Sequence, residues 1–130
     1  MPEVEPGKKM FPEKNFSRDL RLLLPSDYKF VFNQSIRSSD KLLMILVRKN
    51  PSHTQPRLGL AIAKKSVKTA VHRNRIKRLS REFFRLNQDT IACADYVILV
   101  RHGIDKMDNQ VITESLSKQF NYLRKKLSDK

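Results

Sequence analysis

The sequence is poor in cysteine, in acidic residues and in long apolar runs, and each shortage excludes a class of protein. Cys93 is the one cysteine among 130 residues, so it can form neither an internal disulfide nor a thiolate zinc site. The longest apolar run, residues 42–47, is far shorter than the roughly 20 residues that cross a bilayer. Residues 1–12 lack the continuous apolar segment of a secretory signal. We therefore expect a cytoplasmic protein that does not cross a membrane.

Basic residues, in contrast, are abundant. Lys and Arg number 27 against 13 Asp and Glu, which gives a formal net charge of +14. Clustered cations gain affinity for a polyanion by releasing the counterions of its phosphates. This charge favours nucleic acid as the partner, and an anionic membrane surface is the second choice. A chain of this length has room for one small domain with a single core.

Hydrophobic periodicity predicts the order of the main elements. A short helix follows Pro25, with Ser26 as its N-cap and Asp27 near its positive end. Strands are predicted at residues 41–48, 57–63 and 95–101, together with a basic helix from Thr69 and a closing helix at residues 109–127. A further strand remains open, either in residues 18–24 or around Ile36.

In the strand at residues 57–63, bulky and small side chains alternate. The bulky residues on one face are Leu58, Leu60 and Ile62. The small residues on the other face are Gly59, Ala61 and Ala63. The second face therefore admits the close approach of another element.

Between residues 64 and 85, nine basic residues accompany a single acid, Glu82. The basic residues are Lys64, Lys65, Lys68, Arg73, Arg75, Lys77, Arg78, Arg81 and Arg85. On a helical projection from Thr69, one sector holds the apolar residues Ile76, Leu79, Phe83 and Leu86. The opposite sector holds Asn74, Lys77, Arg78, Arg81 and Arg85. The sequence therefore predicts a helix with one buried face and one cationic face.

The cationic face has two interpretations. It could be an ordinary solvated face, as most charge runs on helices are. However, cations four residues apart repel each other by about 0.2–0.5 kcal/mol, and solvated helices usually interleave acids with them. Arginine prevails in this helix, and its planar fork suits bidentate contacts to phosphate. We therefore expect a nucleic acid on this face.

The run RNRIKRLSREFFR at residues 73–85 resembles the signature helix of the bacterial ribonuclease P protein family. The resemblance includes GLAIAKK at residues 59–65, Ala70, the strand at residues 95–100, and the aromatic residues Tyr28 and Phe32. It covers residues 18–127, which it implies to be a single RNA-binding domain. Residues 1–17 fall outside the resemblance, and their mixture of Pro, Gly, Glu and Lys without a clear period predicts a flexible arm. Residues 128–130 are expected to be a C-terminal tail.

The fold implied by this resemblance is an α/β (α+β) two-layer sandwich with a mixed sheet. Its elements follow the order αβββαβα, as in a ribosomal-protein domain, with a left-handed crossover. The implied function is that of the protein subunit of ribonuclease P, in which a catalytic RNA removes the 5′ leader of precursor tRNA. The protein would supply no catalytic residue, and Mg²⁺ would be held mainly by the RNA.

The expected partners are ribonuclease P RNA and precursor tRNA, with no membrane and no obligate protein partner. Similarity to the family places one group of residues against the catalytic RNA. These residues are Lys64, Lys65, Arg73, Asn74, Arg75, Lys77, Arg78, Arg81 and Arg85.

Tyr28 and Phe32 match family positions in a cleft that holds the single-stranded leader. They are four residues apart and share a helical face, where rings stack on unpaired bases at roughly 1–3 kcal/mol each. Two aromatic residues at this spacing are equally typical of a core, although Phe30 and Val31 could supply the buried side instead. Tyr96 could reach the same cleft from its strand, or it could pack in the core.

Two other functions fit the composition. A ribosomal or RNA-chaperone protein would use the same basic helix without assisting any cleavage. A stand-alone nuclease would need converging carboxylates or a pair of histidines, but the three histidines are dispersed along the chain. His72 is better explained as a packing residue at the start of the basic helix, and Asp108 as a cap of the closing helix.

Overall fold

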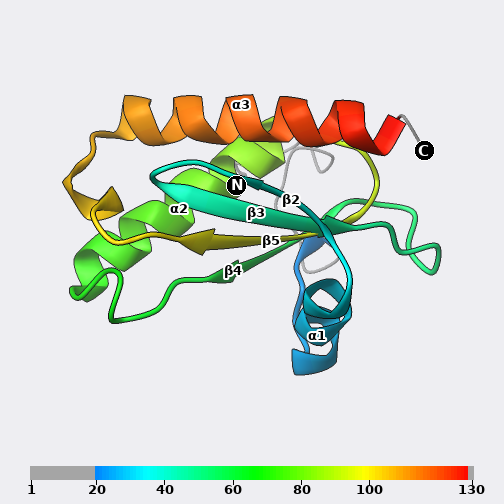
Figure 1. Cartoon of the computed structure of the whole chain (residues 1–130), viewed down its shortest axis with the longest axis horizontal. Helices are drawn as coiled ribbons and strands as arrows, with labels where there is room; N and C mark the ends of the chain where they lie inside the picture. Colours follow the sequence, from blue (N-terminus) through cyan, green and yellow to red (C-terminus); the bar gives the residue numbers. More distant parts are fainter. Residues whose placement is uncertain (1–19, 129–130) are drawn as a thin grey trace, which may run out of the picture.

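The computed structural model describes residues 20–128, which form one four-stranded sheet and three α-helices (Figure 1). The elements in chain order are α1 (Pro25–Asn33), β2 (Ile36–Ser39), β3 (Leu43–Arg48), β4 (Arg57–Ala61), α2 (Ala70–Leu86), β5 (Asp95–Val100), the 3-10 helix η3 (Ile104–Lys106) and α3 (Asn109–Ser128). The predicted order αβββαβα is confirmed, and β2 is the strand that the sequence left open. The predicted arm at residues 1–17 and the last two residues lie outside the described residues.

The sheet is mixed, with the strand order β2-β3-β5-β4. β3 is antiparallel to both of its neighbours, whereas β4 is parallel to β5 and is connected to it through α2. The two interior strands, β3 and β5, are the most apolar because both of their faces are covered. The handedness of the connection through α2 stays a prediction.

The helices divide between the two faces of the sheet. Figure 1 shows α3 running along one face and α1 lying at one end of the other. The main core joins β5 to α2 and α3 through Tyr96, Phe84 and Phe120. A smaller core under α1 contains Val31 and Val97. Because side chains alternate along a strand, Tyr96 and Val97 of β5 face different helices.

The N-terminus of α1 differs from its prediction, because Ser26 does not cap it. The helix begins two residues earlier than a Ser26 cap implies, at Pro25, which fits the first helical position since its missing N–H has no partner there. Leu24 is the N-cap residue, and its backbone N–H donates to Asp27 Oδ2 at 3.1 Å. The predicted place of Asp27 in the first turn is confirmed.

The other helix starts agree with the sequence. Thr69 caps α2, where its hydroxyl accepts from the His72 N–H at 3.4 Å. Asp108 caps α3, where its carboxylate accepts from the Val111 N–H at 3.0 Å. No helix within residues 20–128 is both long and apolar enough to cross a membrane.

Candidate nucleic-acid interface

The buried face of α2 fixes the direction of its cationic face. Ile76 and Phe84 are fully buried, and the ring of Phe83 stacks on Phe120 of α3 at 5.5 Å between centroids. The prediction for Leu86 is wrong, because 56% of this residue is exposed. The buried row passes instead through Ile76, Ser80 and Phe84, which leaves Leu86 at the edge of the last turn.

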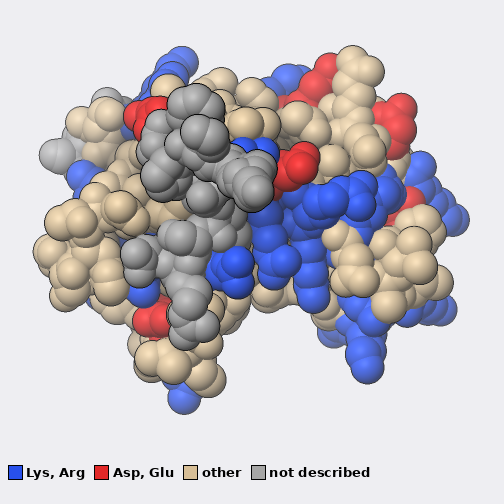
Figure 2. All heavy atoms as spheres, turned by 180° about the vertical axis from the view of Figure 1, so that it is seen from behind, with Lys and Arg blue, Asp and Glu red and all other residues tan. Residues whose placement is uncertain are grey.

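Opposite this buried row, cations line a shallow hollow along α2. Figure 2 shows Lys and Arg side chains gathered on the face of the molecule that is seen from behind. The hollow is lined by Asn74, Lys77, Arg78, Arg81, Glu82 and Arg85 of α2, and by Arg21 from the segment before α1. Arg78 and Arg81 are exposed, and neither forms an ion pair within residues 20–128. Their charge is therefore available to an external anion.

Arg73 and Arg75 also carry a structural role. Arg73 Nη1 donates to the backbone carbonyls of Val67 and Lys68, both at 2.9 Å. Arg75 donates to Asn109 Oδ1 at 2.7 Å and to the Asp105 carbonyl at 3.0 Å. All four acceptors are uncharged, so these hydrogen bonds do not pair either guanidinium with an acid. They hold the start of α2 to the neighbouring segments.

The structure brings most of the predicted RNA-binding residues onto one surface. Lys64 and Lys65 are exposed in the loop between β4 and α2, and Arg85 is half-buried near the end of α2. Arg21 is not among the RNA-binding residues that the sequence predicted. This residue forms a parallel bridge with Leu58 at the edge of β4, which brings it beside α2. Its signal in the sequence was its place in residues 18–24, where a further strand remained open.

Tyr28 lies where α1 and the cationic face of α2 meet. Its hydroxyl accepts from the Leu60 N–H at 3.3 Å, so its ring lies over β4. Tyr28 lines a hollow that also contains Lys77 and Arg81. Phe32, one helical turn further along α1, is 47% exposed. An RNA strand passing α1 would therefore meet aromatic rings and cations on the same side of the molecule.

The prediction that Tyr96 reaches the leader cleft is wrong. Tyr96 is 1% exposed and faces α2 and α3, on the side of the sheet opposite α1. Its ring centroid is 5.2 Å from that of Phe120, and its hydroxyl donates to the Ala92 carbonyl at 2.7 Å. Burial raises the pKa of Tyr96 above its ordinary value. This residue is part of the main core.

Within residues 20–128, no three His, Cys, Asp or Glu side chains are grouped so that they could hold a metal ion. The half-buried His72 has its Nδ1 atom enclosed without a hydrogen-bond partner. This environment agrees with a packing role for His72. The chemistry that the described surface offers is the binding of phosphates and unpaired bases.

Comparison with known proteins gives consistent results. A family model described as "Ribonuclease P" matches residues 16–124. The "Ribonuclease P protein component" of Pasteurella multocida (strain Pm70) is 52% identical over 104 residues, which are 80% of this chain and 87% of that protein. The protein of the same name from Proteus mirabilis (strain HI4320) is 52% identical over 103 residues, covering 79% and 86% of the two chains.

Solved structures agree with these sequence matches. The RNase P protein of Thermotoga maritima, in complex with 1-(4-fluorophenyl)-2-thiourea, superposes with a TM-score of 0.69 at 29% identity, covering 75% of this chain and 94% of that one. The Staphylococcus aureus RNase P protein superposes with a TM-score of 0.76 at 24% identity, covering 80% and 94%. At 24% identity, the likeness to the Staphylococcus aureus protein concerns the fold alone.

Proposed function

Because the chain belongs to the ribonuclease P protein family, we propose that its α2 face binds ribonuclease P RNA and that the surface beside α1 binds the 5′ leader of precursor tRNA. Membership of the family makes it the protein subunit of a ribonucleoprotein endonuclease that acts in tRNA 5′ processing. The two alternatives that composition left open, a ribosomal or chaperone protein and a nuclease that acts alone, are set aside on this ground.

The observation that carries the RNA-binding proposal is the pair of exposed cations Arg78 and Arg81. Both lie on the hollow along α2, and neither has an acid as a partner among the described residues. Guanidinium groups in this setting neutralise phosphates and release the counterions that those phosphates hold. Asn74, Lys77 and Arg85 line the same hollow. Lys64 and Lys65 are exposed in the loop before α2.

The proposal for the leader depends on Tyr28 and Phe32. Exposed aromatic rings stack on unpaired bases with little regard to sequence, which suits leaders of variable sequence. Lys77 and Arg81 share a hollow with Tyr28, so phosphates of the same strand can contact them. Positive protein placed between two RNAs also lowers their mutual repulsion.

In this proposal the RNA performs the chemistry. Mg²⁺ ions are held mainly by the RNA and supply the metal chemistry of phosphodiester hydrolysis, while the protein contributes no catalytic residue. The protein's own contribution is the surface beside α2, where cations outnumber the single acid Glu82 and suit contacts to phosphates. We place the complex in the cytoplasm, where precursor tRNA is expected.

The proposal is tested by measuring the affinities of precursor and mature tRNA for the catalytic RNA with and without the protein. The protein should strengthen precursor binding more than mature binding, because only the precursor has a leader. Phe32→Ala should remove part of this difference. Tyr122→Ala is the matched control, because Tyr122 is equally exposed (47%) but lies on α3. An equal effect of the protein on both tRNAs would reject leader recognition.

A further inference from the structure

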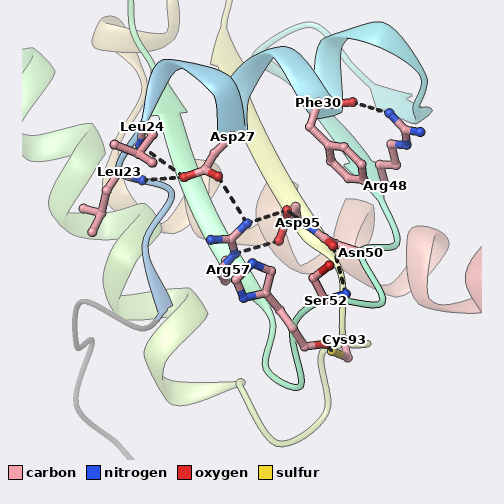
Figure 3. A network of polar contacts seen from close by, with 11 residues as sticks. Leu23, Leu24, Asp27, Phe30, Arg48, Asn50, Ser52, Arg57, Cys93 and Asp95 are labelled. Atoms are coloured by element: carbon pink, nitrogen blue, oxygen red, sulfur yellow. Dashed lines mark hydrogen bonds and ion pairs between the residues drawn. The ribbon is translucent and has the colours of Figure 1, made fainter.

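α1 is a short helix whose position depends on contacts with the rest of the fold. It has nine residues, and Val31 is its one fully buried side chain. Isolated helices of this length are not stable in water, so contacts with the rest of the fold must fix its position. Polar contacts at both ends of α1 supply this fixation (Figure 3).

At the N-terminal end, Asp27 joins α1 to a buried ion pair. One carboxylate oxygen of Asp27 lies 3.6 Å from Arg57 Nη2, and the other accepts from the backbone N–H groups of Leu23 and Leu24. Asp27 therefore binds both the start of its own helix and the first residue of β4.

Arg57 is itself held rigidly by Asp95, the first residue of β5. Arg57 Nε and Nη2 donate to the two carboxylate oxygens of Asp95 at 2.9 and 2.8 Å. The side chain of Arg57 is 10% exposed and that of Asp95 is 1% exposed. Asn50 also donates to Asp95, at 3.0 Å. This bidentate geometry leaves Arg57 little freedom, so it is a fixed point for Asp27.

At the other end, Arg48 at the end of β3 binds the last turns of α1. Its Nη1 donates to the Phe30 carbonyl at 2.7 Å, and its guanidinium lies 3.8 Å from the centroid of the Phe30 ring. This carbonyl is one of the last four of α1, which have no partner within the helix. A cation at this end also interacts favourably with the helix dipole.

From this geometry we propose that Arg48 and Arg57 are positioning residues that set the placement of α1 over the sheet for leader recognition. We name Asp27, Arg48 and Arg57 the α1 clamp. Tyr28 follows Asp27 directly and itself contacts Gly59 and Leu60 of β4, so the contact between Asp27 and Arg57 supports the position of the Tyr28 ring together with these contacts. The clamp residues need not touch RNA. The inference rests on the proposed leader site.

A site that is ordered before binding loses less conformational freedom when the ligand arrives. Releasing one end of the clamp should therefore weaken leader binding even when the aromatic side chains are intact. Mature tRNA has no leader, so its binding should not change.

The sharpest variant is Asp27→Asn. It removes the charge that faces Arg57, keeps an oxygen for the Leu24 N–H, and leaves the buried pair between Arg57 and Asp95 intact. In the reconstituted holoenzyme, we expect precursor affinity to fall by at least about fivefold, the equivalent of one weak base stack. Mature tRNA affinity should stay close to wild type, and the urea midpoint of the free protein should fall only slightly because the buried pair between Arg57 and Asp95 remains.

Two further variants complete the test. Asp27→Glu restores the charge at a position where Glu is favoured in helix caps, so it should recover most of the precursor affinity. Glu114→Gln removes one negative charge from the exposed surface of α3 and should change nothing. Phe32→Ala reports separately on the leader site.

The outcomes separate the two proposals. If Phe32→Ala weakens precursor binding but Asp27→Asn does not, the clamp is wrong and the leader site stands. If Asp27→Asn weakens precursor and mature tRNA equally, its effect is on the whole subunit and the clamp is also wrong. If Phe32→Ala has no effect, the leader site fails and the clamp fails with it.

Discussion

The ring of Tyr28 lies against the α-carbon of Gly59, so close that a β-carbon at position 59 would be 2.7 Å from the ring. The hydroxyl of the same ring accepts the Leu60 N–H. β4 is an edge strand of the four-stranded sheet, so the N–H groups on its outer side need partners from outside that sheet. Tyr28 therefore satisfies one of these groups, and Gly59 provides the space that allows it.

Gly59→Ala should displace the Tyr28 ring and destabilise the protein by about 1–3 kcal/mol, the usual cost of overpacking. Urea unfolding measures this change. The double variant Gly59→Ala/Tyr28→Ala should be more stable than the sum of the single changes predicts, because the two residues are in contact. A Gly59→Ala protein with the wild-type midpoint would contradict the contact.

The stability of the protein should suffer strongly when one partner of the ion pair between Arg57 and Asp95 is removed. Arg57→Leu leaves a carboxylate with 1% exposure without its counter-charge, which typically costs about 3–5 kcal/mol. The double change Arg57→Leu/Asp95→Leu should cost less than Arg57→Leu alone. Thermal or urea unfolding of wild type, Arg57→Leu and the double variant measures these losses of stability. A mild effect of Arg57→Leu would show that the pair is not buried.

Asp40 should make the stability depend on acid pH. Partial burial raises the pKa of Asp40, but hydrogen bonds from Ser115 and from the N–H groups of Leu42 and Leu43 outweigh it, so the pKa lies below its ordinary 3.8. A lowered pKa in the folded state gives stability above pH 3.8 that is lost as the pH falls through the folded value.

Asp40→Asn should therefore cost about 1 kcal/mol at pH 7. The difference between this variant and wild type should shrink as the pH is lowered below 4. Urea unfolding across this range measures it. A difference that stays constant with pH would show that the charge of Asp40 does not contribute.

Substitutions at Tyr96 and Phe32 should affect different properties. The first should lower stability, and the second should change the ratio of precursor to mature tRNA affinity. Tyr96→Phe loses the hydrogen bond to the Ala92 carbonyl and should cost about 1 kcal/mol of stability. It should leave the ratio of precursor to mature tRNA affinity unchanged, because the ring faces α2 and α3. Phe32→Ala should change this ratio with little loss of stability, since Phe32 is half exposed. A change in the ratio for Tyr96→Phe would restore Tyr96 to the leader site.

The sequence predicted the periodic features of the fold well. Apolar runs identified β3 and β5, and alternation identified the face of β4 that approaches α1. The placement of Tyr96 failed because alternation shows that neighbouring residues face opposite sides of a sheet, not which side each one faces. That choice depends on which helix covers each face.

Other failures come from contacts between distant segments. The sequence shows that Arg73 and Arg75 are basic, but not that they hydrogen-bond to the loop before α2 and to residues 105 and 109. The α1 clamp joins residues 27, 48 and 57, which are far apart in the sequence and which only the sheet brings to the two ends of α1. The Ser26 cap failed for a local reason, since Pro25 is better suited to the first helical position.

The central claim is that the α2 face binds phosphates of ribonuclease P RNA. Its most direct test is the salt dependence of the affinity for this RNA, measured for wild type, Arg78→Gln, Arg81→Gln and the α3 control Lys118→Gln. Each α2 change should reduce the log-log slope by about one unit, the value of one lost phosphate contact, while the control keeps the wild-type slope. Slopes for Arg78→Gln and Arg81→Gln equal to that of wild type would contradict the account.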